Sequence, residues 1–264
     1  MAKTQKELAF LRDLYVQDDW TRRFAELVDK HLDVSDLENL LYINAGTGNH
    51  ALSLDEKYGE KVDIFGSCQD EDTLNIARDK AAAISLKADF SLVRFEDDAF
   101  DAVVADATFV LPGKVEAFVE DAVRTARTGG DIAVFLPGAG SFGEVFSLLW
   151  EVLFTEDLGE HGHVAEAMIN ELPTVSALEA MGERAGLVNV RIETAFEIFE
   201  FDNGAAFIAA PLVADFLMPH WLESLSEGEK ERVLEKLAHL IDEEDGTLTF
   251  RFSIKANLLT GEKG

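Results

Sequence analysis

The sequence predicts an α/β protein built around a parallel sheet. Up to residue 138 of the 264, short apolar runs alternate with amphipathic stretches of helical spacing. The first apolar run ends in the glycine-containing turn AGTG, and acidic residues begin the helix that follows the second run. Parallel strands need long crossover connections, which helices usually supply. The alternation therefore predicts a sheet with helices on both faces.

The N-terminal region is expected to form two helices before the core. Leu8, Leu11 and Leu14 recur at helical spacing, and the apolar pattern resumes after a break at Asp18 and Asp19.

Three strand and helix units are expected to follow in order. The first consists of the apolar run LLYIN, the turn AGTG and the helix HALSLDEKYG. The second consists of KVDIFGSC and the helix DEDTLNIARDKAAAI, whose acidic first turn complements the helix dipole. The third is a strand, a helix ended by glycines and another strand: FDAVVAD, VEAFVEDAVRTARTGG and DIAVFLPG.

The C-terminal half continues with a helix, SALEAMGERAG, and an extended stretch, LVNVRIETAFEIFEF. A helical region from residue 205 to 244 and a final alternating strand, TLTFRFSIKANLL, complete the chain. No repeat or linker separates these parts, so a single domain, residues 1–264, is predicted. Its core is expected at about 36–139, 172–201 and 246–260, with helical cap elements at 1–32, 140–170 and 204–244.

Charge and cysteine content limit the classes of partner. The chain has 23 Lys and Arg against 51 Asp and Glu, a formal net charge of -28, which repels nucleic acid and anionic membrane surfaces. We interpret this acidity as favouring solubility. The single cysteine, Cys68, excludes an internal disulfide framework and a multi-cysteine metal site. Charged residues interrupt the N-terminal apolar pattern, so no signal peptide is expected and the protein is predicted to be cytoplasmic.

The turn Gly46-Thr47-Gly48 is the strongest candidate for a binding site. It lies between a predicted strand and a predicted helix, where backbone N–H groups can face an anion or a carboxylate. The segment GTGNHA also fits a dinucleotide-binding pattern with Ala51 in place of the last glycine. The alternative is a turn that only reverses the chain.

The order of motifs over about 150 residues resembles the class I S-adenosylmethionine-dependent methyltransferases, in particular the group that methylates small molecules. LLYINAGTGNHALSL is similar to their first motif, and VDIFGSCQDEDTLNIARDKA to their second strand and helix. LVRFEDDAFDAVVAD, FVEDAVRTARTGGDIAVFLPG and LEAMGERAGLVNVRIET resemble the segments that follow, and the resemblance fades after about residue 200.

The resemblance implies a Rossmann-like, mostly parallel sheet of seven strands, with S-adenosylmethionine lying across the carboxyl ends of the strands. Gly46 and Gly48 would flank its methionine portion, Asp89 and Phe90 would lie near the adenine, and Asp106 would lie near the sulfur. For Asp89 and Phe90 the alternatives are a solvated turn acid and a core aromatic residue. The complete predicted cofactor-binding set is Tyr42, Asn44, Gly46, Thr47, Gly48, Cys68, Gln69, Asp70, Asp89, Phe90 and Asp106.

Three of these residues depart from the family pattern. Tyr42 replaces an acid at the end of the first strand, and Asn44 replaces a glycine two residues later. Cys68 stands where the family has an acid that binds the ribose hydroxyls, and a thiol is a weak donor there. Asp70 is two residues away and could reach back to compensate.

No catalytic motif is obligatory, because methyl transfer depends mainly on positioning and needs a base only when the acceptor loses a proton. His161, His163 and His220 are the candidate bases, and exposed histidines are the alternative interpretation. The histidines lack a third ligand at recognisable spacing, so no metal is expected.

The sequence thus predicts S-adenosylmethionine-dependent methyl transfer to a small, partly apolar molecule. The alternative is a non-catalytic binding or interaction protein with the same fold and a degenerate cofactor pocket. A nicotinamide-dependent oxidoreductase is disfavoured, because the resemblance beyond the glycine turn is to methyltransferases. A homodimer is compatible with the apolar segment around His220.

Overall fold

The computed structural model describes residues 3–245 and 249–264 and divides the chain into two compact units. The first unit contains the residues up to Leu136, Val175–Ala195 and Ala256–Gly264, and the second contains Pro137–Thr174 and Phe196–Lys255. The division into two units does not test the prediction of a single domain, which stays a prediction. The predicted ranges 1–32 and 246–260 begin with residues 1–2 and 246–248, which lie outside the described residues.

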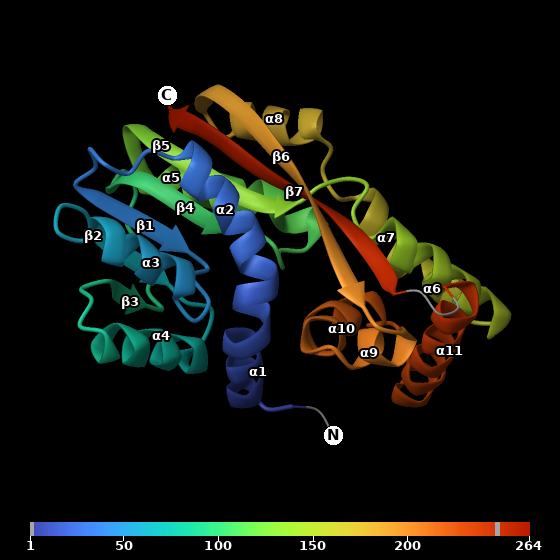
Figure 1. Ribbon diagram of the computed structural model, residues 1–264. Helices are drawn as coiled ribbons and strands as arrows, with labels where there is room; N and C mark the ends of the chain where they lie inside the picture. Colours follow the sequence, from blue (N-terminus) through green and yellow to red (C-terminus); the bar gives the residue numbers. More distant parts are fainter. Residues whose placement is uncertain (1–2, 246–248) are drawn as a thin grey trace. The chain divides into compact units, whose positions relative to one another are not determined.

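A seven-stranded sheet with the order β3-β2-β1-β4-β5-β7-β6 organises the chain (Figure 1). The pairs β1–β2, β1–β4, β2–β3 and β4–β5 are all parallel. Figure 1 shows β7 running opposite to β6, and both of these strands pass through the two units. The predicted fold class is confirmed. The strands are β1 (Asn39–Ile43), β2 (Asp63–Ser67), β3 (Asp89–Ser91), β4 (Phe100–Asp106), β5 (Ala126–Pro137), β6 (Leu187–Phe201) and β7 (Phe250–Lys263).

Helices of the first unit pack on both faces of this sheet. Alternate residues of β4 point to opposite faces, as the strand period requires, so Val103 joins the cluster formed with the apolar face of α5. On the opposite face Phe135 of β5 packs against Phe24 and Tyr42, with ring centroids 6.1 and 6.5 Å away. The helical segments of this unit are α1 (Gln5–Leu11), η1 (Arg12–Thr21), α2 (Arg22–His31), α3 (Asn49–Tyr58), α4 (Glu71–Ala83), η2 (Pro112–Lys114), α5 (Val115–Thr125) and α8 (Val175–Arg184).

The N-terminal helical region differs from the prediction. The break expected at Asp18 and Asp19 does not occur, because the chain stays helical through η1, which has π-helical hydrogen bonding. The wider π turn absorbs the shift in apolar phase and turns Val16 and Trp20 inward. Leu14, which was expected on the apolar face, is 63% exposed.

The helix predicted to end at the glycines of TARTGG also ends earlier than expected. It stops at Thr125, because Ala126 is extended and begins β5. Gly129 has a φ of 73°, and the pairing of β4 with β5 shifts register between Phe100 and Ala102. The glycines therefore accommodate an irregularity inside a strand rather than the end of a helix.

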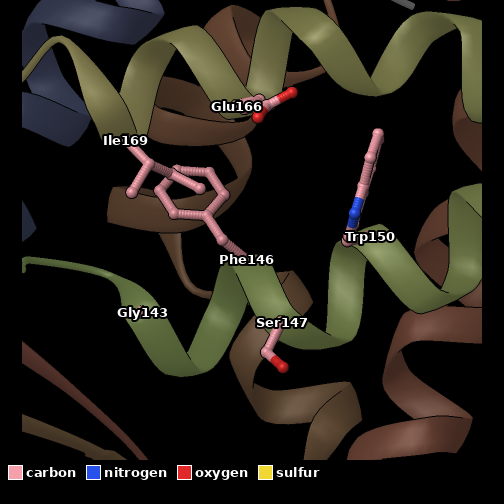
Figure 2. A pocket seen from close by; sticks show the side chains of 6 residues that line it. All are labelled: Gly143, Phe146, Ser147, Trp150, Glu166 and Ile169. Carbon is pink, nitrogen blue, oxygen red and sulfur yellow. The ribbon is translucent and has the colours of Figure 1, made fainter.

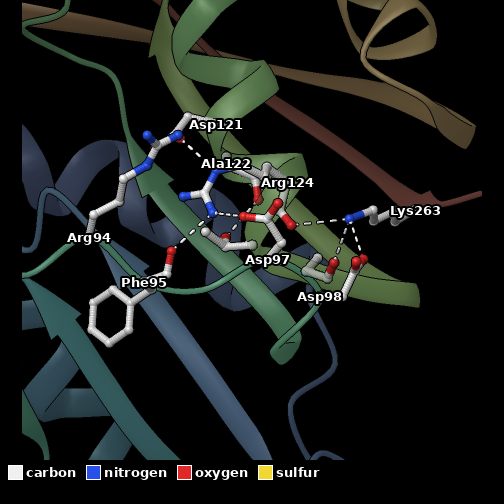
Figure 3. A network of polar contacts seen from close by, with 10 residues as sticks. Arg94, Phe95, Asp97, Asp98, Asp121, Ala122, Arg124 and Lys263 are labelled. Carbon is white, nitrogen blue, oxygen red and sulfur yellow. Dashed lines mark hydrogen bonds and ion pairs between the residues drawn. The ribbon is translucent and has the colours of Figure 1, made fainter.

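A polar network fixes the amino end of β4, at the opposite end of that strand from Asp106 (Figure 3). Arg124 donates to Asp121 at 2.9 Å and also pairs with Asp97. The Lys263 ammonium group donates to Asp98 at 2.7 Å and to the carbonyl of Ala126 at 2.8 Å. These bonds tie the C-terminal strand to the loop before β4.

The second unit is built from helices around a cluster of aromatic rings. Phe252 is fully buried, and its ring centroid lies 5.0 Å from that of Phe199 and 5.8 Å from those of Phe142 and Phe201. Trp221 meets Phe146 at 5.0 Å. The helical segments of this unit are α6 (Gly143–Thr155), η3 (Gly159–His161), α7 (Gly162–Asn170), α9 (Gly204–Ala209), η4 (Leu212–Leu217), α10 (Met218–Trp221) and α11 (Glu227–Asp245).

Among the described residues, no helix is both long and apolar enough to cross a bilayer.

Candidate functional site

The glycine turn lies at the carboxyl end of β1, where three residues have the positive φ of the left-handed region. Asn44 has a φ of 57°, Gly46 of 58° and Gly48 of 86°, and Gly48 is the N-cap residue of α3. Glycine adopts these angles without the steric penalty that a Cβ brings. The turn is held to the neighbouring strand, because the Ala45 N–H donates to the Ser67 carbonyl at 2.8 Å. The turn thus joins the ends of β1 and β2.

Asn44 connects this turn to the next parallel strand. Its side-chain amide donates to the carbonyl oxygen of Asp106 at 3.0 Å, and its own carbonyl accepts from the Gln69 side chain at 3.4 Å. Asparagine is among the few non-glycine residues that tolerate a positive φ. The departure at position 44 therefore keeps the turn and adds a tie to β4.

Asp106 is a buried carboxylate at the carboxyl end of β4. One of its oxygens accepts from the backbone N–H of Thr108 at 2.8 Å and from the Thr108 hydroxyl at 2.6 Å. Burial raises the pKa of Asp106, against the opposing effect of these hydrogen bonds and of the positive charge of Arg12. A cation in front of this strand end is therefore favoured.

The N-terminal helical region supplies side chains to the site that the sequence did not predict. A Cβ on Gly46 would overlap the side-chain amide of Gln17 and lie 3.4 Å from the guanidinium of Arg12. Asp13 accepts from the Thr47 hydroxyl at 2.7 Å and pairs with Lys80 at 2.6 Å. Arg12 and Gln17 therefore occupy the space in front of the glycine turn.

One signal in the sequence could have identified this role. Arg12, Asp13 and Gln17 are polar residues interleaved with Val16 and Trp20, the residues that face the core. Polar side chains beside the buried stripe of a helix need partners of their own, which points to contacts with a polar surface rather than with solvent.

Arg12 brings a positive charge close to two carboxylates of the site, Asp106 and Asp70. Burial lowers its pKa, while the charges of Asp106 and Asp70 act in the opposite direction. Its guanidinium carbon lies 5.1 Å from the centre of the Phe109 ring. The positive charge is held over an apolar ring and within the field of two carboxylates.

Tyr42 is buried beneath the turn and takes part in a polar chain. Its hydroxyl lies 3.1 Å from Nδ1 of His50, whose Nε2 lies 3.3 Å from Asp29. Burial raises the pKa of Tyr42 well above its usual value, and the charges of Asp106 and Asp29 act in the same direction. Tyr42 is therefore a neutral phenol at the position where the family has a carboxylate.

Cys68 and Asp70 follow the end of β2. Burial raises the pKa of the Cys68 thiol to about 12, so the thiol stays protonated at neutral pH. Asp70 begins α4 as its N-cap, with its carboxylate accepting from the Thr73 N–H at 2.8 Å. One of its oxygens is thus already committed to the helix that it starts.

Asp89 and Phe90 lie on β3 and point in different directions. Asp89 is exposed, while Phe90 is buried, and a Cβ on Gly48 would lie 2.9 Å from the tip of the Phe90 ring. Arg78 of α4 donates twice to the Phe90 carbonyl, at 2.7 and 3.0 Å. Phe90 thus packs behind the glycine turn, and Asp89 remains accessible at its edge.

The three candidate histidines all belong to the second unit. His163 Nδ1 lies 2.7 Å from the Glu160 carbonyl oxygen, and His161 Nε2 lies 3.7 Å from the Glu160 carboxylate. His220 is exposed on α10. Their role as bases stays a prediction. Within the described part of the chain, no three His, Cys, Asp or Glu side chains gather in a way that could hold a metal ion.

The segment that contains the turn is similar to a known protein family. Residues 40–130, from β1 into β5, match the family described as a methyltransferase domain. This segment is similar to that family over about a third of the chain. The family resemblance seen in the sequence is thus confirmed for these residues. No curated protein sequence matches the chain.

Several solved structures are similar to this chain in fold, at low sequence identity. The YcgJ protein of Bacillus subtilis is 14% identical, with a TM-score of 0.59 over 92% of this chain and 98% of its own. Phosphoethanolamine N-methyltransferase 2 of Haemonchus contortus, solved with phosphomonomethylethanolamine and S-adenosylhomocysteine, is 12% identical, with a TM-score of 0.55 over 98% of this chain and 57% of its own. The [4+2]-cyclase SpnF is 19% identical, with a TM-score of 0.52 over 91% of this chain and 80% of its own.

Proposed function

We propose that this chain binds S-adenosylmethionine at the glycine turn and transfers its methyl group to a small, partly apolar molecule. The observation that carries the proposal is the methyltransferase-domain match, which covers the segment containing the turn at the ends of β1, β2 and β4. The structure of the Haemonchus enzyme with S-adenosylhomocysteine supports the choice of cofactor. When bound, the cofactor supplies a methyl group on a positively charged sulfur.

The charges around the turn suit a positively charged ligand. Asp106 and Asp70 already act on the Arg12 guanidinium, which takes the place of an external cation in this conformation. The positive-φ glycines leave the backbone of the turn open to close approach. Asp106 and Asp89 would face the ligand's cationic and adenine ends, while the buried Tyr42 and Phe90 would shape the pocket floor without charge.

The space fits only after a rearrangement of the N-terminal helical region. Arg12 and Gln17 stand against Gly46, so both side chains must move aside before a ligand can lie on the turn. The residue pattern of η1 is compatible with such a change, since π-helical turns are often found at functional sites. In this proposal, the positively charged ligand replaces the Arg12 guanidinium at the turn.

Calorimetric titration with S-adenosylmethionine and S-adenosylhomocysteine tests the proposal, and Cys68→Asp sharpens it. Restoring the acid of the family pattern at the end of β2 should strengthen binding by about tenfold, because a carboxylate accepts hydrogen bonds that a thiol does not. Cys68→Ser is the matched control and should leave the affinity within about twofold. Titration with NAD is expected to give no binding heat, because the sequence disfavours a nicotinamide-dependent oxidoreductase.

A second candidate function is a non-catalytic binding or interaction protein. The observation that favours it is the filling of the turn by Arg12 and Gln17, together with Tyr42 and Cys68 in place of acids. The similarity to SpnF, a cyclase, is a reminder that one fold serves several activities. Absence of binding up to millimolar S-adenosylmethionine in both the parent and Cys68→Asp would overturn the enzyme proposal and favour this one.

A further inference from the structure

A cavity of about 270 Å³ lies in the second unit, between helices α6 and α7. The described residues that line it are Gly143, Phe146, Ser147, Trp150, Glu166 and Ile169 (Figure 2). The size is close to the lower end of small-molecule sites, which begin near about 300 Å³. None of the residues predicted for the cofactor lines it, so this cavity is separate from the candidate site at the glycine turn.

Two aromatic rings form opposite walls of this cavity. In Figure 2, Phe146 and Ile169 lie on one side and the indole of Trp150 lies on the other. Phe146 is held in place from behind, because its ring centroid lies 5.9 Å from that of Phe142 and 5.0 Å from that of Trp221. One wall is thus fixed before any ligand arrives.

The Trp150 wall is positioned by a glycine. A Cβ on Gly162, the first residue of α7, would overlap the six-membered ring of Trp150. Only a residue without a side chain leaves the indole room to lie against the backbone there. Trp150 as a residue is nevertheless 48% exposed, so part of its side chain remains available for contact.

Among the described residues that line the cavity, Glu166 is the one that carries a charge. Figure 2 shows its carboxylate projecting from α7 above the gap between the two rings, while Ser147 points away from that gap. No Lys, Arg or His of the described chain forms an ion pair with Glu166. An accessible carboxylate above two aromatic faces is therefore left for a ligand to neutralise.

We propose that this cavity binds a small organic ammonium ion that carries apolar substituents. Aromatic faces attract cations through their negative quadrupole, and Trp is the most effective of them. The Glu166 carboxylate adds attraction for a positive charge, while the apolar walls contact the substituents. An anionic ligand is disfavoured by Glu166 and by the net charge of -28. The proposal goes beyond methyl transfer and does not depend on cofactor binding.

Choline and 3,3-dimethylbutan-1-ol form the probe pair, because they differ only in the replacement of the ammonium nitrogen by carbon. The full chain, labelled with 5-fluorotryptophan, gives one fluorine signal for each of its three Trp residues. Choline should shift the Trp150 signal and leave the signal of Trp20, which lies in the first unit, unchanged. The neutral alcohol should bind at least about fivefold more weakly, which corresponds to a cation–π contact at a partly exposed site.

Glu166→Gln should weaken choline binding by about threefold to fivefold and leave the alcohol unaffected. Glu151→Gln is the matched control, because it removes the same charge from an exposed position of α6 that does not line the cavity. Three outcomes would each overturn the proposal. The two probes could bind with equal affinity, or the two variants could change choline affinity equally. The Trp150 fluorine signal could also fail to shift when choline is in 100-fold excess over millimolar protein.

Phosphatidylcholine vesicles test whether the bound ammonium ion comes from a free small molecule or from a lipid head group. Cosedimentation of the protein with vesicles, without a Trp150 shift on adding free choline, would contradict a site for free small cations. Binding of choline without cosedimentation would support it.

Discussion

The candidate sites of the two units are formed by different kinds of structure. In the first unit, the site consists of backbone turns at strand ends, and its geometry follows from the parallel register and from positive φ angles at Asn44, Gly46 and Gly48. In the second unit, the cavity is shaped mainly by side chains, since Phe146 is held by other rings and Trp150 lies against Gly162. The first site therefore depends on backbone conformation and charge, and the second on packing.

This difference predicts that the units respond to different substitutions. The largest effect is expected for Phe252→Ala, because Phe252 is fully buried within the aromatic cluster of the second unit. The lost burial and the cavity left behind should lower the free energy of unfolding by about 3 to 5 kcal/mol, measured by urea denaturation. Phe154→Ala is the control, since Phe154 is 81% exposed and its loss should cost less than about 0.5 kcal/mol. Similar small effects for both variants would mean that packing does not hold this unit.

The next effect concerns the first unit and the reactivity of its thiol. Burial raises the pKa of Cys68 from 9.0 to about 12, so the thiolate fraction at pH 8 is about a thousandfold smaller in the folded than in the unfolded chain. Alkylation by iodoacetamide should be slower by roughly this factor in native buffer than in urea. Cys68 is the single cysteine of the sequence, so no other thiol contributes to the rate. A native rate within tenfold of the unfolded one would show that the end of β2 is open to solvent.

Much of the first unit could be predicted because its signals are local. FDAVVAD coincides with β4 (Phe100–Asp106), since its central residues 102–105 form the short apolar run expected of a strand buried on both faces. The glycine turn was recognisable because positive φ selects for glycine. The N-terminal contribution of Arg12 and Gln17 was missed, because which helix face meets the turn depends on the π-helical phase of η1.

The second unit could be predicted only as helical. Its helix α6 contains apolar residues on almost every side, including the exposed Trp150 and Phe154, so periodicity does not identify the buried face. The cavity arises where helices α6 and α7 bring Trp150 against Gly162. Such pairing is a tertiary contact that no local pattern encodes.

A third prediction concerns a carboxylate that holds strands together in the first unit. Asp101 accepts from the backbone N–H groups of Glu38 at 2.7 Å and Asn39 at 3.1 Å, and it pairs with Arg127. Burial acts to raise the pKa of Asp101, but the hydrogen bonds from Arg127 and from these N–H groups outweigh it and lower the pKa below 3.8. Asp101→Asn should therefore cost about 1 to 3 kcal/mol in the free energy of unfolding at neutral pH.

The pH dependence gives this prediction its sign. Because the pKa of Asp101 is lower in the folded than in the unfolded chain, its contribution is complete above the unfolded value of 3.8 and is lost as pH falls through the folded value. The difference in unfolding free energy between the parent and Asp101→Asn should thus be constant from pH 5 to 7 and shrink below about pH 4. A difference that does not change down to pH 3 would assign the cost to lost shape rather than to lost charge. No comparable acid dependence is expected for Phe252→Ala in the second unit.

The smallest expected effect tests whether the N-terminal helical region competes with a ligand for the glycine turn. Arg12 supplies the positive charge that Asp106 and Asp70 favour, at the cost of its own desolvation. Arg12→Ala removes that charge and vacates the space beside Gly46, so the carboxylates are left to a cationic ligand. The variant should melt at a lower temperature than the parent, because two carboxylates lose a favourable charge, yet it should bind S-adenosylmethionine about tenfold more tightly in calorimetric titration. Arg22→Ala, on the exposed side of α2, removes the same charge away from the turn and should leave the affinity unchanged. Weaker binding by Arg12→Ala would mean that Arg12 contacts the ligand instead of competing with it, because a residue that only blocks the turn cannot improve binding by being present.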